Sequence, residues 1–115
     1  MLIVDDHPSF RQFASRLLAG AGFDVVGEAA DASAAIRVVK SLRPDVVLLD
    51  VVLPDRSGLA VANELAAEPH APAIVLISSR SRSDFGDSFE WPPGCVFMPK
   101  HELTAARLAE ALDRT

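Results

Sequence analysis

Short apolar runs without alternation are the feature of this sequence that most restricts its fold. Four of them are clear: residues 2–4, 46–49, 73–77 and 96–98; a weaker one lies at residues 23–28. A strand buried on one face alternates apolar and polar residues, whereas a parallel strand covered by helices on both faces is apolar throughout. The runs therefore indicate parallel strands sandwiched between two layers of helices.

Helical patterns lie between these runs. Pro8 suits the first turn of a helix that ends near Ala19, and Asp31 and Ser57 suit the N-caps of the next two helices. The apolar residues expected on inner helix faces are Ala35, Ile36, Val39 and Leu42, then Leu59, Ala62, Leu65 and Ala66, and last Leu103, Leu108 and Leu112. Strands and helices that alternate in this way predict an α/β fold with a doubly wound, five-stranded parallel sheet.

The fourth helix of such a fold is expected to be short or irregular. Residues 81–90 are polar and contain Gly86, and the segment Trp-Pro-Pro-Gly follows at residues 91–94. Prolines and glycine end a helix, because proline lacks the N–H and glycine favours the unwound state. Trp91 has two expected roles of equal weight: it packs beneath this loop, or it contacts a partner.

Length and composition predict one soluble domain over residues 1–115, in the cytoplasm. The net charge of −5 argues against a surface that binds nucleic acid directly. Cys95 is the only cysteine, so no internal disulfide forms, as in a reducing compartment. No apolar run approaches the ~20 residues of a membrane span, so no contact with a membrane is expected.

Polar residues follow four of the predicted strands. Asp5 and Asp6 follow the first run, Asp50 the second, Ser78 the third, and Lys100 follows the last run after one proline. Each has an ordinary explanation alone, such as a helix cap for Asp6, but in a parallel sheet all of them meet at one edge. Clustered carboxylates attract a hard divalent cation such as Mg²⁺, and an aspartate beside one can attack a phosphoryl group.

Four motifs, in this order and spacing, resemble the receiver domain of bacterial two-component response regulators. They are "LIVDDHP", "VVLLDVVLPDRSG", "VLISS" and "VFMPK", and the opening "DDHPSFR" is similar to the NarL/LuxR-type branch. The resemblance covers essentially the whole chain and implies a flavodoxin-like strand order 2-1-3-4-5. It also implies that a sensor histidine kinase donates a phosphoryl group from a phosphohistidine to Asp50.

The resemblance further implies a role for each residue of the cluster. Asp5, Asp6 and Asp50 would hold Mg²⁺ together with the backbone carbonyl of Val52. Lys100 would pair with a phosphoryl oxygen.

Two further residues match the positions that change conformation in this family. Ser78 would be the switch hydroxyl and Phe97 the switch aromatic, while Gly58 matches a tight loop after the phosphoacceptor. Receivers of the NarL/LuxR-type branch usually precede a DNA-binding helix-turn-helix domain, which implies a C-terminal output domain beyond this chain. We expect a monomer or weak homodimer, since residues 81–90 are too polar for a large apolar interface.

Two other functions fit the sequence less well. A phosphohydrolase with an aspartyl nucleophile usually needs a second acid two residues after the nucleophile, and Val52 stands there. A pseudo-receiver, which signals without phosphorylation, should have lost an acidic residue or the lysine, and none is lost. We therefore expect a phosphoacceptor whose only chemistry is its own Mg²⁺-dependent phosphorylation and dephosphorylation.

Overall fold

The computed structural model describes residues 1–85, 91–92 and 94–113. One parallel sheet contains strands β1 (Leu2–Val4), β2 (Gly27–Ala29), β3 (Val46–Asp50), β4 (Ala73–Ser78) and β5 (Cys95–Pro99), in the order β2-β1-β3-β4-β5. The helices are α1 (Pro8–Gly20), α2 (Ala32–Leu42), α3 (Gly58–Ala66) and α4 (Ala105–Asp113), with 3-10 turns η1 (Arg82–Phe85) and η2 (Lys100–Glu102). The predicted doubly wound sheet and its strand order are confirmed.

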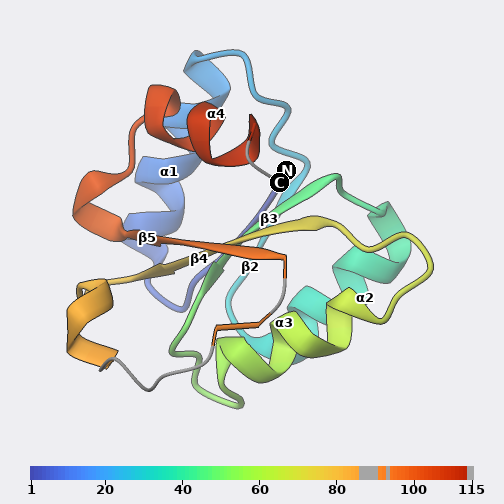
Figure 1. Ribbon diagram of the computed structural model, residues 1–115. Coiled ribbons are helices and arrows are strands. Elements are labelled where there is room, and N and C mark those ends of the chain that lie inside the picture. Colours follow the sequence, from blue (N-terminus) through green and yellow to red (C-terminus); the bar gives the residue numbers. More distant parts are fainter. Residues whose placement is uncertain (86–90, 93, 114–115) are drawn as a thin grey trace.

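Helices cover both faces of the sheet (Figure 1): α1 and α4 pack on one face, and α2 and α3 on the other. Successive residues of a strand point to opposite faces. In β3, for example, Leu48 is buried with α1 and α4, whereas Val47 and Leu49 are buried with α2 and α3. Strands β1, β3, β4 and β5 therefore each supply two cores, which explains why their sequences show no alternation.

The predicted helix starts are confirmed, while two details of the pattern are wrong. Leu42, expected on an inner face, is 53% exposed in the last turn of α2, and Ala66 is also exposed at the end of α3. The weak strand, expected over residues 23–28, begins only at Gly27. β2 is limited by its partner β1, which has three residues, and the Val26 N–H already donates to the carbonyl of Met1, just before β1. Burial at helix ends and strand length thus depend on neighbours that a local pattern does not reveal.

In the region where the fourth helix was expected, the described residues contain only the 3-10 turn η1; residues 86–90 lie outside the described part. Three aromatic rings pack together there. The centroid of the Trp91 ring lies 4.6 Å from that of Phe97 and 5.2 Å from that of Phe85, and Phe85 and Phe97 are 5.7 Å apart. The rings also pack against the core beneath α2 and α3.

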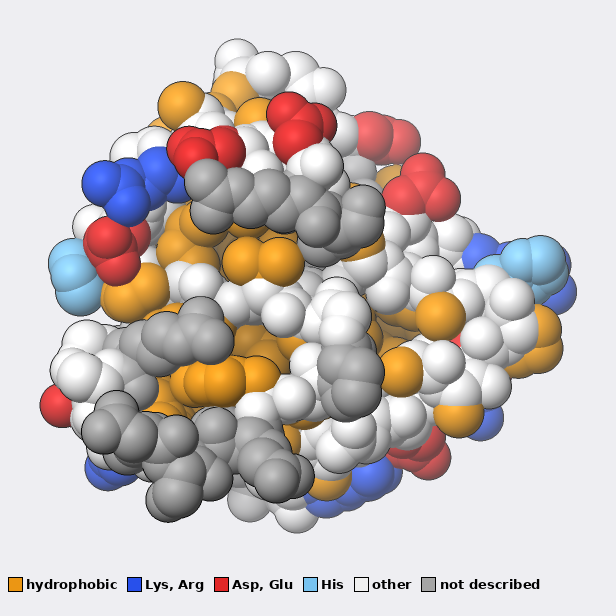
Figure 2. Space-filling model, in the orientation of Figure 1, with side chains coloured by type: hydrophobic (Ala, Val, Ile, Leu, Met, Phe, Trp, Pro, Cys, Tyr) orange, Lys and Arg blue, Asp and Glu red, His pale blue; other side chains and the backbone are white. Residues whose placement is uncertain are grey.

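This aromatic cluster, Phe85, Trp91 and Phe97, therefore covers the part of the sheet beside β5. In the orientation of Figure 1, hydrophobic side chains reach the surface on both sides of β5 (Figure 2). Of the two roles expected for Trp91, the structure describes the packing role.

Replacing Trp91 with alanine should destabilise the fold, because the indole packs on two aromatic rings that close one core. We expect Trp91→Ala to lower the free energy of unfolding by about 2 kcal/mol, less than for a fully buried aromatic. Urea unfolding followed by circular dichroism measures this. Phe13→Ala is the control, since Phe13 is 53% exposed on α1. Equal, small effects of both substitutions would contradict the packing role.

Candidate functional site

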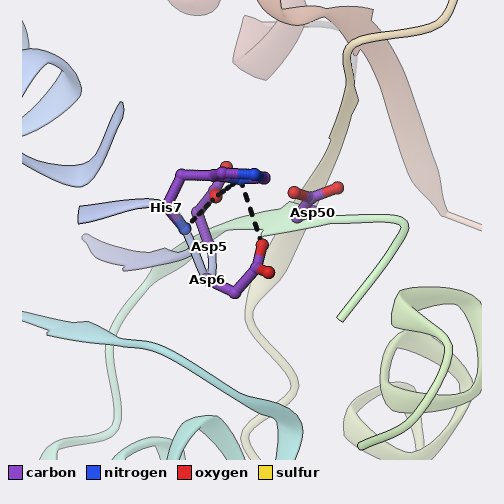
Figure 3. Close-up of side chains that lie close together, drawn as sticks. All are labelled: Asp5, Asp6, His7 and Asp50. Atoms are coloured by element: carbon purple, nitrogen blue, oxygen red, sulfur yellow. Dashed lines mark hydrogen bonds and ion pairs between the residues drawn. The ribbon is translucent and has the colours of Figure 1, made fainter. Parts of the chain in front are cut away.

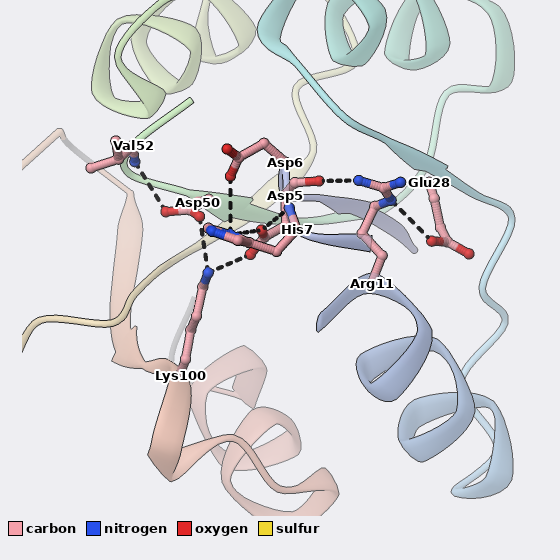
Figure 4. A network of polar contacts seen from close by, with 8 residues as sticks. All are labelled: Asp5, Asp6, His7, Arg11, Glu28, Asp50, Val52 and Lys100. Atoms are coloured by element: carbon pink, nitrogen blue, oxygen red, sulfur yellow. Dashed lines mark hydrogen bonds and ion pairs between the residues drawn. The ribbon is translucent and has the colours of Figure 1, made fainter. Parts of the chain in front are cut away.

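Three of the predicted residues meet at the carboxyl edge of the sheet. Asp50 ends β3, Asp5 directly follows β1, and Lys100 directly follows β5. The Lys100 ammonium lies 2.6 Å from Asp5 Oδ2 and 3.0 Å from Asp50 Oδ2 (Figure 4). Both carboxylates are buried: Asp5 is 0% and Asp50 4% exposed. One cation thus lies between two anions that are shielded from water.

Burial and charge shift the titration of these groups in different directions. Burial raises the pKa of Asp50, although the Val52 N–H and the Lys100 ammonium act against it. Burial also acts to raise the pKa of Asp5, but Lys100 and the N–H and imidazole of His7 hold it below its usual value. Burial acts to lower the pKa of Lys100, but the two carboxylates raise it. The partners of Asp50 therefore offset the effect of burial on its pKa less fully than the partners of Asp5 do.

Asp6 and His7 complete the cluster on its exposed side. His7 Nδ1 lies 3.0 Å from Asp5 Oδ1 and 3.1 Å from Asp6 Oδ1 (Figure 3). His7, and not Asp6, is the residue before α1, and among the described residues no side chain caps this helix, so the cap explanation of Asp6 is wrong. One ligand atom from each of Asp5, Asp6, His7 and Asp50 lies within 4.8 Å of the others. Three carboxylates, two of them buried and one exposed, fit the oxygen ligands that Mg²⁺ prefers.

Ser78 and Phe97 do not join this cluster among the described residues. Ser78 ends β4, one residue beyond Ile77, which pairs with Asp50 in the sheet, and Ser78 is 2% exposed. Its hydroxyl accepts a hydrogen bond from the Arg80 N–H at 3.0 Å, and within the described residues it has no hydrogen bond to Asp50. Phe97 belongs to the aromatic cluster on the face of α2 and α3.

Arg11 was missed by the sequence analysis. Its guanidinium donates to the backbone carbonyl of Asp5 at 2.6 Å and lies 3.3 Å from Glu28 Oε1 (Figure 4). The contact ties α1 and β2 to the turn that carries Asp5. The only sequence signal is an arginine one helical turn after His7, which by itself indicates nothing about its partner.

The loop after β3 is folded tightly against the strand end. Val52 N–H donates to Asp50 Oδ1 at 3.0 Å, and Val52 forms an antiparallel bridge with Ser57. Gly58 N–H donates to the carbonyl of Val51 at 2.7 Å. A Cβ atom on Gly58 would lie 2.0 Å from the Asp50 carbonyl oxygen, so only glycine fits here. The predicted tight loop is confirmed, and its cause is this close backbone approach.

Comparison with known proteins agrees with this arrangement. The model of the response regulator receiver domain family matches residues 1–89. The chain belongs to this family. The receiver is 40% identical over 86 residues to the DNA-binding response regulator MtrA of Mycolicibacterium smegmatis. Its fold resembles the signal receiver domain of the NarL response regulator of Mycobacterium tuberculosis, with a TM-score of 0.82 and 30% identity over 98% of this chain and 91% of that one.

The relatives differ in what accompanies the receiver. A protein-glutamate methylesterase/protein-glutamine glutaminase of Hahella chejuensis is 34% identical over 84 residues. The matches cover 73% of this chain in both cases, but only 36% of MtrA and 24% of the methylesterase. What this receiver controls therefore does not follow from the similarity. In the described part of the chain, no helix has the length and apolar character needed to cross a membrane.

Removing the charge of Asp50 should stabilise the protein when no metal is bound, because Asp5 and Lys100 would remain as a matched pair. The pKa of Asp50 is higher in the folded protein than in the unfolded chain, so ionisation of Asp50 costs stability. The full cost applies at pH values above the pKa of Asp50 in the folded protein. It disappears below the pKa of an aspartate in the unfolded chain, about 3.9. We expect Asp50→Asn to raise the free energy of unfolding at pH 7 by roughly 1 kcal/mol.

Urea unfolding between pH 7 and pH 4, without divalent cations, tests this expectation. The advantage of Asp50→Asn should shrink as the pH falls, since the wild-type carboxyl becomes protonated. Asp45→Asn, an exposed aspartate before β3 at the opposite edge of the sheet, is the control. A variant less stable than wild type at pH 7 would show that Lys100 requires both carboxylates.

Proposed function

We propose that this receiver accepts a phosphoryl group on Asp50 from a sensor histidine kinase, in a Mg²⁺-dependent reaction, and relays the signal by a change of conformation. The observation that carries the proposal is the fixed orientation of a buried carboxylate. Val52 N–H holds Asp50 Oδ1, and Lys100 contacts Oδ2. A nucleophile held from both sides needs little reorganisation before it attacks phosphorus.

The reaction would form one bond and break one. An oxygen of Asp50 bonds to the phosphorus, the P–N bond of the phosphohistidine breaks, and its electron pair returns to the imidazole. The ammonium of Lys100 would then neutralise a phosphoryl oxygen, in place of one carboxylate oxygen that it contacts now. Asp5, Asp6, Asp50 and the carbonyl of Val52 would hold Mg²⁺, which supplies positive charge to the phosphoryl oxygens.

The competing functions are less well supported. A pseudo-receiver has no use for a buried lysine between two aspartates, because this arrangement costs stability unless it binds something. A phosphohydrolase needs a second acid to activate water, whereas the Val52 side chain beside Asp50 is apolar and 64% exposed.

Signal output would follow from the two switch residues. We propose that the Ser78 hydroxyl turns from the Arg80 N–H toward the phosphoryl group, and that Phe97 responds within the aromatic cluster. The receiver would act in the cytoplasm as a monomer or weak homodimer, without direct contact to nucleic acid. A DNA-binding output domain that follows it in the natural protein would carry the response, as the name of MtrA suggests for that relative.

Phosphorylation is tested directly by intact-mass spectrometry with Mg²⁺ and acetyl phosphate as donor. The wild-type protein should gain the mass of one phosphoryl group, and Asp50→Asn should gain none, because the variant lacks the proposed acceptor carboxylate. Lys100→Ala should reduce the labelling strongly, and omission of Mg²⁺ should abolish it. Equal labelling of wild type and Asp50→Asn would exclude Asp50 as the acceptor.

The side chain of Val52 should set the lifetime of the phosphorylated state. Val52 follows Asp50 by two residues, and its methyl groups cannot orient a water molecule for attack on phosphorus. We therefore expect slow hydrolysis, and we expect Val52→Asn to speed it by about 10-fold, the effect of one modest hydrogen bond to the transition state.

The measurement is the decay of phosphorylated protein after the donor is removed. Val52→Ile is the matched control, because it keeps an apolar branched side chain, and its decay should equal that of wild type. A wild-type lifetime of seconds, or no acceleration in Val52→Asn, would refute this explanation.

A further inference from the structure

The first three N–H groups of α2 donate to carboxylates. Asp31, the residue before the helix, accepts a hydrogen bond from Ala34 N–H at 2.8 Å. Asp55 accepts the N–H groups of Ala32 at 2.9 Å and Ser33 at 3.1 Å, and also the Ser33 hydroxyl at 3.1 Å. The start of a helix leaves such N–H groups without partners inside the helix and carries partial positive charge. α2 thus needs acceptors at its start. Two carboxylates serve it, and one of them, that of Asp55, is not adjacent to the helix in sequence.

Asp55 comes from the loop that follows the phosphoacceptor. The bridge between Val52 and Ser57 closes this loop, and Asp55 lies inside it. The loop is fixed to the sheet at one end, where Val51 N–H donates to the carbonyl of Ile77 at 2.9 Å. The carboxylate of Asp55 fixes its other side to α2. The backbone between the two anchors includes Val52, whose N–H orients Asp50.

We propose that Asp55 is a positioning residue for the metal site: by binding the start of α2, it holds the loop so that the Val52 carbonyl and the Asp50 carboxylate keep their orientation toward the acidic cluster. This inference rests on the proposed function, since it assumes that the cluster binds Mg²⁺. The ionised form suits the role, because the N–H groups of Ala32 and Ser33 lower the pKa of Asp55. Asp55 itself does not touch the cluster; it acts through the loop.

The chain offers a matched control for this proposal. Asp31 caps the same helix, yet it belongs to the segment before α2 and has no part in the loop. Asp31→Ala and Asp55→Ala each remove one carboxylate from the same helix start. Both should lower the melting temperature, but only the second should affect the metal site.

Isothermal titration calorimetry with MgCl₂ measures the dissociation constant of the full chain without any phosphodonor. Asp55→Ala should weaken Mg²⁺ binding by about tenfold, the usual scale for a residue that orients a ligand from outside the site. Asp31→Ala should bind Mg²⁺ as the wild type does. Asp55→Asn keeps one acceptor oxygen and should fall between Asp55→Ala and wild type.

Phosphorylation by acetyl phosphate gives a second readout. Asp55→Ala should react slowly at low Mg²⁺ and approach the wild-type rate at saturating Mg²⁺, because the defect lies in the orientation of a ligand. Wild-type Mg²⁺ affinity in Asp55→Ala, or equal weakening in Asp31→Ala, would overturn the positioning role alone. Absence of Mg²⁺ binding by the wild type would overturn the proposed function, and the positioning role with it.

Discussion

A single ammonium between two buried carboxylates is the constraint on which the rest of this structure depends. Lys100 lies within hydrogen-bonding distance of Asp5 and Asp50, which lie at the ends of the neighbouring strands β1 and β3. Burial raises the pKa of Asp50, and the single positive charge of Lys100, which Asp50 shares with Asp5, offsets this rise only in part. The fold tolerates this cost because two cores and a tightly anchored loop hold the strand ends together. A site with excess negative charge is suited to gain a cation, and then a phosphoryl group that the cation and Lys100 stabilise together.

The central residues of the site could be predicted because strand ends converge in a parallel sheet. Asp5, Asp50 and Lys100 each follow an apolar run, and the register of parallel strands brings such positions together whatever the intervening helices contain. The same logic predicted the sheet, its two-sided burial and the helix starts. Gly58 could be recognised from its motif, but the reason for it, a backbone contact with Asp50, required coordinates.

Other residues of the site could not be predicted, because their side chains bind backbone groups that lie outside their own helix or loop. Arg11 on α1 binds a backbone carbonyl, and Asp55 binds backbone N–H groups of α2. A backbone group carries no signature in the sequence, so no pattern identifies either contact. Leu42 shows the same limit for packing: its place in the helical pattern is correct, yet its side chain is 53% exposed at the end of α2.

The aromatic cluster beside β5 has a consequence for the specificity of signalling. Within the described residues, a protein that recognises a receiver through a regular helix at this position would meet η1 and the half-buried rings of Phe85 and Trp91. Such a mismatch disfavours partners of other receivers as effectively as repulsive contacts do. A cell with many parallel pathways has to keep them apart, and we expect this surface to insulate the receiver from crosstalk while its phosphorylation chemistry stays common to the family.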